Sequence, residues 1–195
     1  MNRLRLYRAL KLPLDVIVAA LVLLPMLPVL AVLCIAIRLE SRGPAVYRQK
    51  RVGRFGREFT IFKLRSMKTD APLLSTEEMQ RAGLSPFTRL GPFLRKSNLD
   101  ELPQIWNILR GEMSFVGPRP ALPSQTDVNT LRKEMGVEIA RPGITGLAQV
   151  VGRDDLDTQT KVGCDARYCQ TMSAWNDLLL VLRTFEAVVS ARGNK

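Results

Sequence analysis

An apolar run near the start of the chain dominates its hydrophobic pattern. Residues Val16–Ile37 carry no charged side chain, and every face of a helix built from them would be apolar. Such a helix would be roughly 33 Å long, enough to cross a hydrocarbon core of about 30 Å. Pro25 and Pro28 lie in its middle, where each removes a backbone donor and clashes with the preceding turn. The run therefore predicts a membrane segment that is broken near Leu27 and Pro28.

Basic residues lie on both sides of this apolar run. They are Arg3, Arg5, Arg8 and Lys11 before it, and Arg38, Arg42, Arg48, Lys50, Arg51, Arg54 and Arg57 after it. Because positive segments prefer the cytoplasmic side, a spanning helix would place one flank on the wrong side. A helix that enters, bends and returns keeps both flanks on anionic inner-leaflet lipid, where each basic residue contributes about 1 kcal/mol. We therefore expect residues 1–40 to form a re-entrant membrane helix, with a proline-kinked span as the alternative.

After this segment the pattern changes to that of a folded domain. Ala45–Gln49 and Glu58–Lys63 predict two short strands joined by a turn that contains Gly53 and Gly56. Further along, Ser97 or Asn98 can cap a helix that continues to Leu109. Other helices are predicted around Thr76–Ala82, at Asp127–Ala140 and after the cap Ser173, whereas Phe115–Pro120 and Arg141–Gly146 are predicted as rigid loop and turn. The predicted fold class is α+β, mostly helical, with a small β-hairpin and the re-entrant membrane helix at the N-terminus.

The last predicted helix carries one broad apolar face. Its members are Trp175, Leu178, Leu179, Leu182, Phe185 and Val189. A face of this kind suits either a protein core or the surface of a membrane, and the pattern leaves both open.

The composition narrows the chemistry and the partners. Lys and Arg number 29 against 18 Asp and Glu, so the net charge of +11 requires an anionic partner. The three tyrosines and two tryptophans are not interleaved with the basic clusters as base-stacking platforms would be, which disfavours nucleic acid. The absence of histidine excludes Ser-His-Asp hydrolases and histidine-based zinc sites. The three cysteines have neither zinc nor disulfide spacing, which fits a reducing cytoplasmic setting.

Without histidine, difficult transfer chemistry falls to a carboxylate nucleophile or a carboxylate-held metal. Asp100 and Glu101 stand side by side at a predicted helix start, where two hard oxygen donors suit Mg²⁺ together with phosphate oxygens. Lys63, Arg65 and Arg95 could hold the phosphate. Acids in a first turn are also common partners of the helix dipole, so both interpretations stay open.

Two further motifs are candidates for chemistry. Arg119 lies between Pro118 and Pro120, which would fix the backbone and hold the guanidinium ready for bidentate phosphate contact. Asp155 and Asp157 imitate the DxD metal motif of nucleotide-sugar glycosyltransferases, but such triplets are frequent and this one lies in a polar loop.

Four stretches of the sequence resemble the bacterial sugar transferase family, the monotopic phosphoglycosyl transferases. They are FKLRSM (Phe62–Met67), RKSNLDELPQIWNILRGEMSFVGPRP (Arg95–Pro120), RPGITGLAQVVGR (Arg141–Arg153) and DARYCQTMSAWNDLLLVLRT (Asp165–Thr184). With the apolar run they cover nearly the whole chain, which has the minimal size for this family. The resemblance implies a membrane enzyme that moves a phospho-sugar from a UDP-sugar to polyprenyl phosphate, using Mg²⁺ and a covalent aspartyl intermediate and releasing UMP.

The same resemblance implies roles for single residues. Asp100 matches the nucleophile, and Glu101 matches its Mg²⁺-handling neighbour. The full set of expected phosphate or nucleotide contacts is Lys63, Arg65, Arg95, Pro118, Arg119, Pro120 and Arg153. This chain departs from the family pattern at Leu27, where the helix break has Ser before the proline, and at Val151, where Asn is common.

The expected location is the bacterial cytoplasmic membrane. Residues 41–195 would form a catalytic domain with interfacial helices on the cytoplasmic face, in contact with anionic inner-leaflet lipid, as a monomer or a homo-oligomer. Two other functions stay as alternatives. One is a DxD glycosyltransferase that would release UDP, and the other is a non-enzymatic basic membrane adaptor in which Asp100 would be dispensable.

Overall fold

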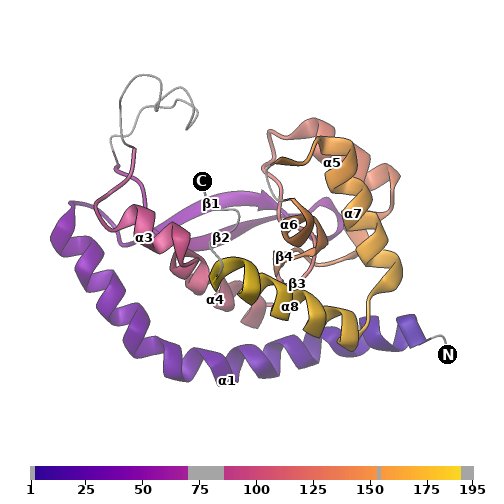
Figure 1. The fold of residues 1–195 in the computed structure, drawn as a ribbon, viewed down its shortest axis with the longest axis horizontal. Helices are drawn as coiled ribbons and strands as arrows, with labels where there is room; N and C mark the ends of the chain where they lie inside the picture. Colours follow the sequence, from indigo (N-terminus) through magenta and orange to yellow (C-terminus); the bar gives the residue numbers. More distant parts are fainter. Residues whose placement is uncertain (1–2, 70–85, 153–154, 190–195) are drawn as a thin grey trace.

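The structure is a computed structural model that describes residues 3–69, 86–152 and 155–189 of the 195-residue chain. One long helix, α1, curves along one side of the molecule, and the other elements lie on its concave side (Figure 1). The short helix predicted around Thr76–Ala82 lies outside the described residues.

Helix α1 spans Arg3–Glu40 and runs without interruption through Pro13, Pro25 and Pro28. The break expected near Leu27 and Pro28 takes the form of curvature within one helix, since each proline costs a backbone hydrogen bond while the turns around it keep theirs. Of the described residues, only those of α1 form a helix long and apolar enough to cross a membrane, and its most apolar window is 6% buried.

The predicted hairpin is present. Strand β1 (Val46–Val52) pairs antiparallel with β2 (Glu58–Leu64), and Val46 lies opposite Leu64. A short 3₁₀ turn at Arg54–Gly56 joins them. Both strands continue past their predicted last residues, because the backbone pairing extends beyond the residues in which apolar and polar side chains alternate.

A second strand pair lies where the sequence predicted loop and turn. Strand β3 (Ser114–Val116) runs parallel to β4 (Gly143–Thr145), so the loop and turn predictions were wrong at these residues. Strands of three residues are too short to leave a periodic pattern. A Cβ atom on Gly143 would lie 2.1 Å from the backbone nitrogen of Gly117, so only glycine permits this close approach.

The remaining elements are short helices around the two strand pairs. They are α3 (Gly91–Lys96), a 3₁₀ helix at Leu99–Gln104, α4 (Ile105–Leu109), α5 (Thr126–Glu134), a 3₁₀ turn at Val137–Ile139, α6 (Leu147–Val151), α7 (Thr158–Thr171) and α8 (Ala174–Val189).

Two of the predicted helix ends differ from the observed ones. Neither Ser97 nor Asn98 caps the helix after it by a side-chain hydrogen bond, and the Ser97 hydroxyl instead donates to the Phe93 carbonyl at 2.7 Å. The helix predicted to reach Ala140 ends at Glu134, because Gly136 turns the chain with a φ of 68°.

Helix α1 contacts the rest of the chain through a narrow stripe. Ala19 is fully buried in one apolar cluster with Ile61 of β2 and Ile108 of α4, and Ile37 is buried in another with Leu64. Most of the apolar side chains of α1 point away from the domain. Their exposed members include Leu6, Leu10, Leu14, Ile17, Leu21, Leu24, Val32, Ile35 and Leu39.

Two basic residues expected on lipid turn into the protein instead. Lys11 is buried and forms an ion pair with Asp177 of α8, and a terminal nitrogen of Arg8 donates to the Cys169 carbonyl at 2.6 Å. The N-terminal flank therefore attaches α1 to α7 and α8 as well as adding positive charge. The spacing of basic residues in the sequence does not distinguish these two roles.

The final helix begins as predicted, because the Ser173 hydroxyl accepts a hydrogen bond from the Asn176 backbone N–H at 3.2 Å. Its apolar face is not core. Trp175, Leu178, Leu182 and Phe185 are exposed. Helix α8 lies beside α1 (Figure 1), and an exposed apolar face is the kind of surface that the predicted interfacial helix requires, so that interpretation stays a prediction.

The contact between β3 and β4 yields a stability prediction. Gly143→Ala should lower the free energy of unfolding by more than about 2 kcal/mol, because the new methyl group overlaps the Gly117 backbone. Thermal unfolding of the purified chain in detergent measures the change. Gly163→Ala in α7 is the matched control, since nothing lies within 4 Å of its new Cβ. Equal losses in the two variants would contradict this account of the glycine.

Candidate active site

Asp100 and Glu101 line a cavity of about 880 Å³. Segments far apart in the sequence meet there: the end of β2, residues 95–102, residues 119–122, α5, α6 and α7. Its cationic lining residues are Arg51, Lys63, Arg95, Arg119, Arg132 and Lys161. A cavity with two adjacent carboxylates and six cations suits an anionic ligand that also needs a carboxylate at its reacting centre.

The backbone before the two acids places them in this cavity. Asn98 adopts the left-handed conformation with a φ of 55°, which Asn tolerates better than most residues. The chain then enters the 3₁₀ helix Leu99–Gln104, whose first turn holds both acids. Since a 3₁₀ helix has three residues per turn, successive side chains point about 120° apart, so the two carboxylates face different surroundings.

Glu101 is the ionised partner of two cations. Its Oε1 accepts a hydrogen bond from Lys63 Nζ at 2.7 Å and from both terminal nitrogens of Arg119 at 3.2 Å. Burial alone would raise the pKa of Glu101, but Arg119 and Lys63 outweigh it and lower the pKa to about 2. Glu101 is therefore a fixed negative charge that keeps Lys63 and Arg119 aimed into the cavity.

Asp100 has the opposite environment. It is 8% exposed, and no described residue donates a hydrogen bond to its carboxylate. Burial raises the pKa of Asp100 above its ordinary value, the charge of Lys63 opposes that change, and the charge of Glu101 adds to it. A buried carboxylate without a hydrogen-bond donor is available to react or to bind a cation.

Most of the predicted substrate contacts come together here. Lys63, Arg95, Arg119 and Pro120 line the cavity with the two acids, whereas Pro118 lines a neighbouring cavity of about 300 Å³. Arg153 lies outside the described residues.

Arg65 does not join this group, although the sequence placed it among the phosphate contacts. It is buried, and its guanidinium donates to the carbonyls of Arg42 at 2.8 Å, Ser41 at 2.7 Å and Ile37 at 3.3 Å. These carbonyls belong to the end of α1 and the turn after it, where helical partners are missing. Arg65 therefore caps α1 instead of lining the cavity.

Sequence reasoning missed three cationic residues of the cavity. Arg51, counted with the lipid-facing flank, donates to the Pro120 carbonyl at 3.0 Å and so supports the Arg119 loop. Arg132 of α5 forms a buried ion pair with Asp165 of α7 at 2.6 Å, and Lys161 lies one turn before Asp165. No local motif marks these residues, because helix packing alone brings α5 and α7 together at the cavity.

Asp100 and Glu101 offer the carboxylate oxygens that Mg²⁺ prefers, but two carboxylates do not complete its coordination. Among the residues that the structure describes, no group of three or more acidic, Cys or His side chains could hold a metal ion on its own. Mg²⁺ is commonly held by one or two carboxylates together with substrate phosphates. Asp100 and Glu101 fit that mode of binding, in which a phosphate ligand would supply the remaining oxygens.

The DxD candidate lies elsewhere. Asp157 caps α7: its Oδ1 accepts from the Thr160 N–H at 2.9 Å and its Oδ2 accepts from the Thr160 hydroxyl at 2.6 Å. These hydrogen bonds lower the pKa of Asp157. Neither Asp155 nor Asp157 is among the described lining residues of the large cavity. The DxD interpretation therefore loses its support.

The chain is similar to known proteins along nearly its full length. A family model described as bacterial sugar transferase matches residues 6–191. The chain is 44% identical over 186 residues to a UDP-glucose:undecaprenyl-phosphate glucose-1-phosphate transferase of Caulobacter vibrioides, covering 91% of this chain and 68% of that protein. It is 34% identical over 200 residues to an undecaprenyl-phosphate galactose phosphotransferase of Salmonella typhimurium, covering 95% of this chain and 42% of that protein.

A third relative has a less specific name. The chain is 37% identical over 203 residues to a protein of Haemophilus influenzae named an uncharacterized sugar transferase, covering 95% of this chain and 42% of that protein. The chain thus spans 42% of the length of the Haemophilus and Salmonella relatives.

Proposed function

The chain belongs to the bacterial sugar transferase family, and from this premise we propose that it transfers a phospho-sugar from a UDP-sugar to polyprenyl phosphate and releases UMP. The names of the Caulobacter and Salmonella relatives support the lipid acceptor, because both include undecaprenyl phosphate. The observation that carries the proposal is the pair in the cavity, in which Asp100 accepts no hydrogen bond from the described residues and the neighbouring Glu101 is neutralised by Lys63 and Arg119.

The proposed reaction has two steps. A carboxylate oxygen of Asp100 attacks the β-phosphorus of the donor, and the bond from that phosphorus to the bridging oxygen breaks, so UMP leaves with the oxygen and its electron pair. An oxygen of polyprenyl phosphate then attacks the same phosphorus and displaces Asp100. The product is a polyprenyl-diphosphate sugar, and the carboxylate is regenerated.

The cations of the cavity would reduce the repulsion between the Asp100 carboxylate and the diphosphate of the donor. An anionic nucleophile is repelled by a diphosphate unless positive charge offsets it. Lys63, Arg95 and Arg119 line the same cavity as Asp100 and suit the donor phosphates. Mg²⁺, held by Asp100 or Glu101 and the diphosphate, would add a Lewis acid that neutralises the leaving phosphate.

Apolar side chains in the lining of the cavity suit the lipid chain of the acceptor. Val22 and Met26 of α1 and Val181 and Phe185 of α8 are among them. Because α1 is, among the described residues, the helix long and apolar enough to cross a membrane, a polyprenyl chain could follow these side chains out of the membrane while its phosphate reaches Asp100. A site lined by both polar and apolar side chains brings a water-soluble donor and a lipid acceptor together.

We further propose that the catalytic domain faces the cytoplasm, because both basic flanks of α1 favour the inner leaflet. Residue 2 and residue 195 should then both be cytoplasmic. Cysteines introduced at either position should resist a membrane-impermeant thiol reagent added to intact cells and should react after the cells are opened. Labelling of residue 2 from outside would contradict the re-entrant arrangement.

The nucleophile is the most direct test of the reaction. Incubation with UDP-sugar and Mg²⁺ in the absence of acceptor should release UMP, up to about one equivalent per enzyme, and leave a phospho-sugar on the peptide that holds Leu99–Pro103. Asp100→Asn should abolish both signals, because an amide is a far poorer nucleophile. Mass spectrometry of the protein and chromatography of the nucleotide measure them.

Asp157→Asn is the matched control for this experiment. Asparagine can still cap α7, so the variant should keep wild-type UMP release and the adduct. Strong turnover by Asp100→Asn, or release of UDP that depends on Asp157, would replace the proposal with the DxD glycosyltransferase.

The apolar part of the lining gives a separate prediction. Met26→Trp should narrow the apolar side of the cavity and slow transfer to undecaprenyl phosphate by roughly tenfold, while acceptor-free UMP release stays within about twofold of wild type. Leu24→Trp is the control, since Leu24 points outward from the same helix. Equal effects of the two variants on transfer would show that the acceptor does not follow these side chains.

A further inference from the structure

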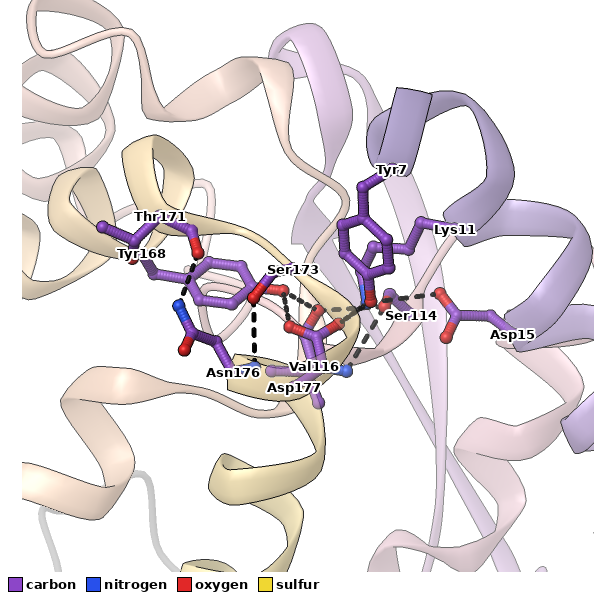
Figure 2. Close-up of polar contacts among 10 residues, drawn as sticks. All are labelled: Tyr7, Lys11, Asp15, Ser114, Val116, Tyr168, Thr171, Ser173, Asn176 and Asp177. Carbon is purple, nitrogen blue, oxygen red and sulfur yellow. Dashed lines mark hydrogen bonds and ion pairs between the residues drawn. The ribbon is translucent and has the colours of Figure 1, made fainter. Parts of the chain in front are cut away.

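A buried group of polar side chains joins α1 to the domain that carries the candidate active site. We call it the anchor cluster. It consists of Tyr7, Lys11 and Asp15 of α1, Ser114 of β3, Tyr168 of α7 and Asp177 of α8 (Figure 2). Figure 2 shows the side chains of α1 and Tyr168 approaching Asp177 from different sides. The proposed reaction uses none of these residues, so their burial needs another explanation.

Asp177 is the centre of the cluster. Lys11 forms an ion pair with its Oδ2, and the Tyr7 hydroxyl donates to the same oxygen at 2.7 Å. Asp15 lies on the other side of Lys11, with 3.7 Å between Lys11 Nζ and Asp15 Oδ2. Lys11, Asp15 and Asp177 are all buried. Charges removed from water tolerate few geometries, so the cluster fixes one position of α1 on the domain.

Tyr168 connects this anchor to β3. Its hydroxyl lies 2.9 Å from Asp177 Oδ1 and 3.0 Å from the Val116 carbonyl oxygen, and the residue is 2% exposed. Burial, with the charge of Asp177, keeps the pKa of Tyr168 well above its ordinary value, so the hydroxyl holds its proton. One neutral hydroxyl therefore stands between the residue that holds α1 and the last residue of β3.

The chain after Val116 leads directly to the site. Gly117 N–H donates to the Thr145 carbonyl at 2.8 Å, and Pro118 and Pro120 restrict the backbone on both sides of Arg119. Arg119 then reaches Glu101 at 3.2 Å. This short, proline-restricted segment is the covalent path from Val116 to Arg119.

We propose that Tyr168 is a positioning residue that couples the seating of α1 on the domain to the placement of Arg119 beside Glu101. Arg119 then has its reactive position only when the membrane helix is docked. The kinetic consequence rests on the proposed function, whereas the structural coupling does not. The competing explanation is that the anchor cluster only stabilises the fold, with no preferred connection to Arg119.

Hydrogen–deuterium exchange of the full chain in detergent separates the two explanations without an activity assay. Tyr168→Phe removes one hydroxyl and leaves the Val116 carbonyl with the Ser114 hydroxyl, 2.9 Å away, as its remaining side-chain donor. Exchange should rise roughly tenfold both in the peptide around Tyr7–Asp15 and in the peptide around Ser114–Pro120. Tyr7→Phe, which loosens only the α1 side of Asp177, should raise exchange in the first peptide and less in the second.

Tyr47→Phe is the matched control, because it makes the same chemical change on an exposed tyrosine of β1. It should change neither peptide. An increase in Tyr168→Phe that is confined to α7, or spread evenly over the whole domain, would overturn the proposal.

A double-mutant cycle tests whether Tyr168 acts through Arg119, with acceptor-free UMP release as the measured rate. Tyr168→Phe should slow release roughly tenfold in the wild-type chain but less than about twofold in the Arg119→Lys background. Equal tenfold losses in both backgrounds would overturn the proposal. If the wild-type chain releases no UMP from any UDP-sugar, the proposed function fails, and the exchange experiment still decides the coupling.

Discussion

The attachment of α1 is the constraint on which the rest of the molecule depends. The helix is too apolar for water, yet its domain forms a cavity for anions. Ala19 and Ile37 supply apolar contact along a narrow stripe, and the apolar side chains that point outward form a surface suited to lipid. Apolar contact alone allows a helix to slide or rotate. The buried ion pair of Lys11 with Asp177 removes that freedom, because a displaced charge would lose its partner inside the protein.

The positive charge of the chain is divided among three tasks that composition cannot separate. Lys63 and Arg119 neutralise Glu101 in the cavity, Arg65 caps the end of α1, and Lys11 fixes its beginning. The sequence predicted most of the basic residues near α1 as a belt on anionic lipid. That expectation follows from their spacing around an apolar run, but burial of Lys11, as of Arg65 that was predicted as a phosphate contact, depends on partners more than twenty residues away.

The sequence predicted the features that depend on neighbouring residues, and it missed those that depend on contacts between distant segments. Helix α1, the hairpin and the Ser173 cap each depend on residues within one element, so periodicity and cap chemistry were sufficient. The parallel pairing of β3 with β4 depends on Gly117 and Gly143, which are brought together only by the fold. The same holds for the ion pair of Arg132 with Asp165. Adjacency and resemblance picked out Asp100 and Glu101, which line the cavity, whereas Arg132 and Lys161 beside them left no such signal.

Adjacent residues in the cavity can have opposite roles because the 3₁₀ turn separates their side chains. Glu101 faces Lys63 and Arg119, and its low pKa means that it stays ionised at any physiological pH. Asp100 lines the cavity with no hydrogen-bond donor from the part of the chain that the structure describes, and burial raises its pKa because the anion has lost water. A phosphorus centre with its cations would restore the missing stabilisation as the reaction proceeds. In the proposed reaction, the cations beside Glu101 would therefore serve two states in turn, since they would hold Glu101 before the donor arrives and face the donor phosphates afterwards.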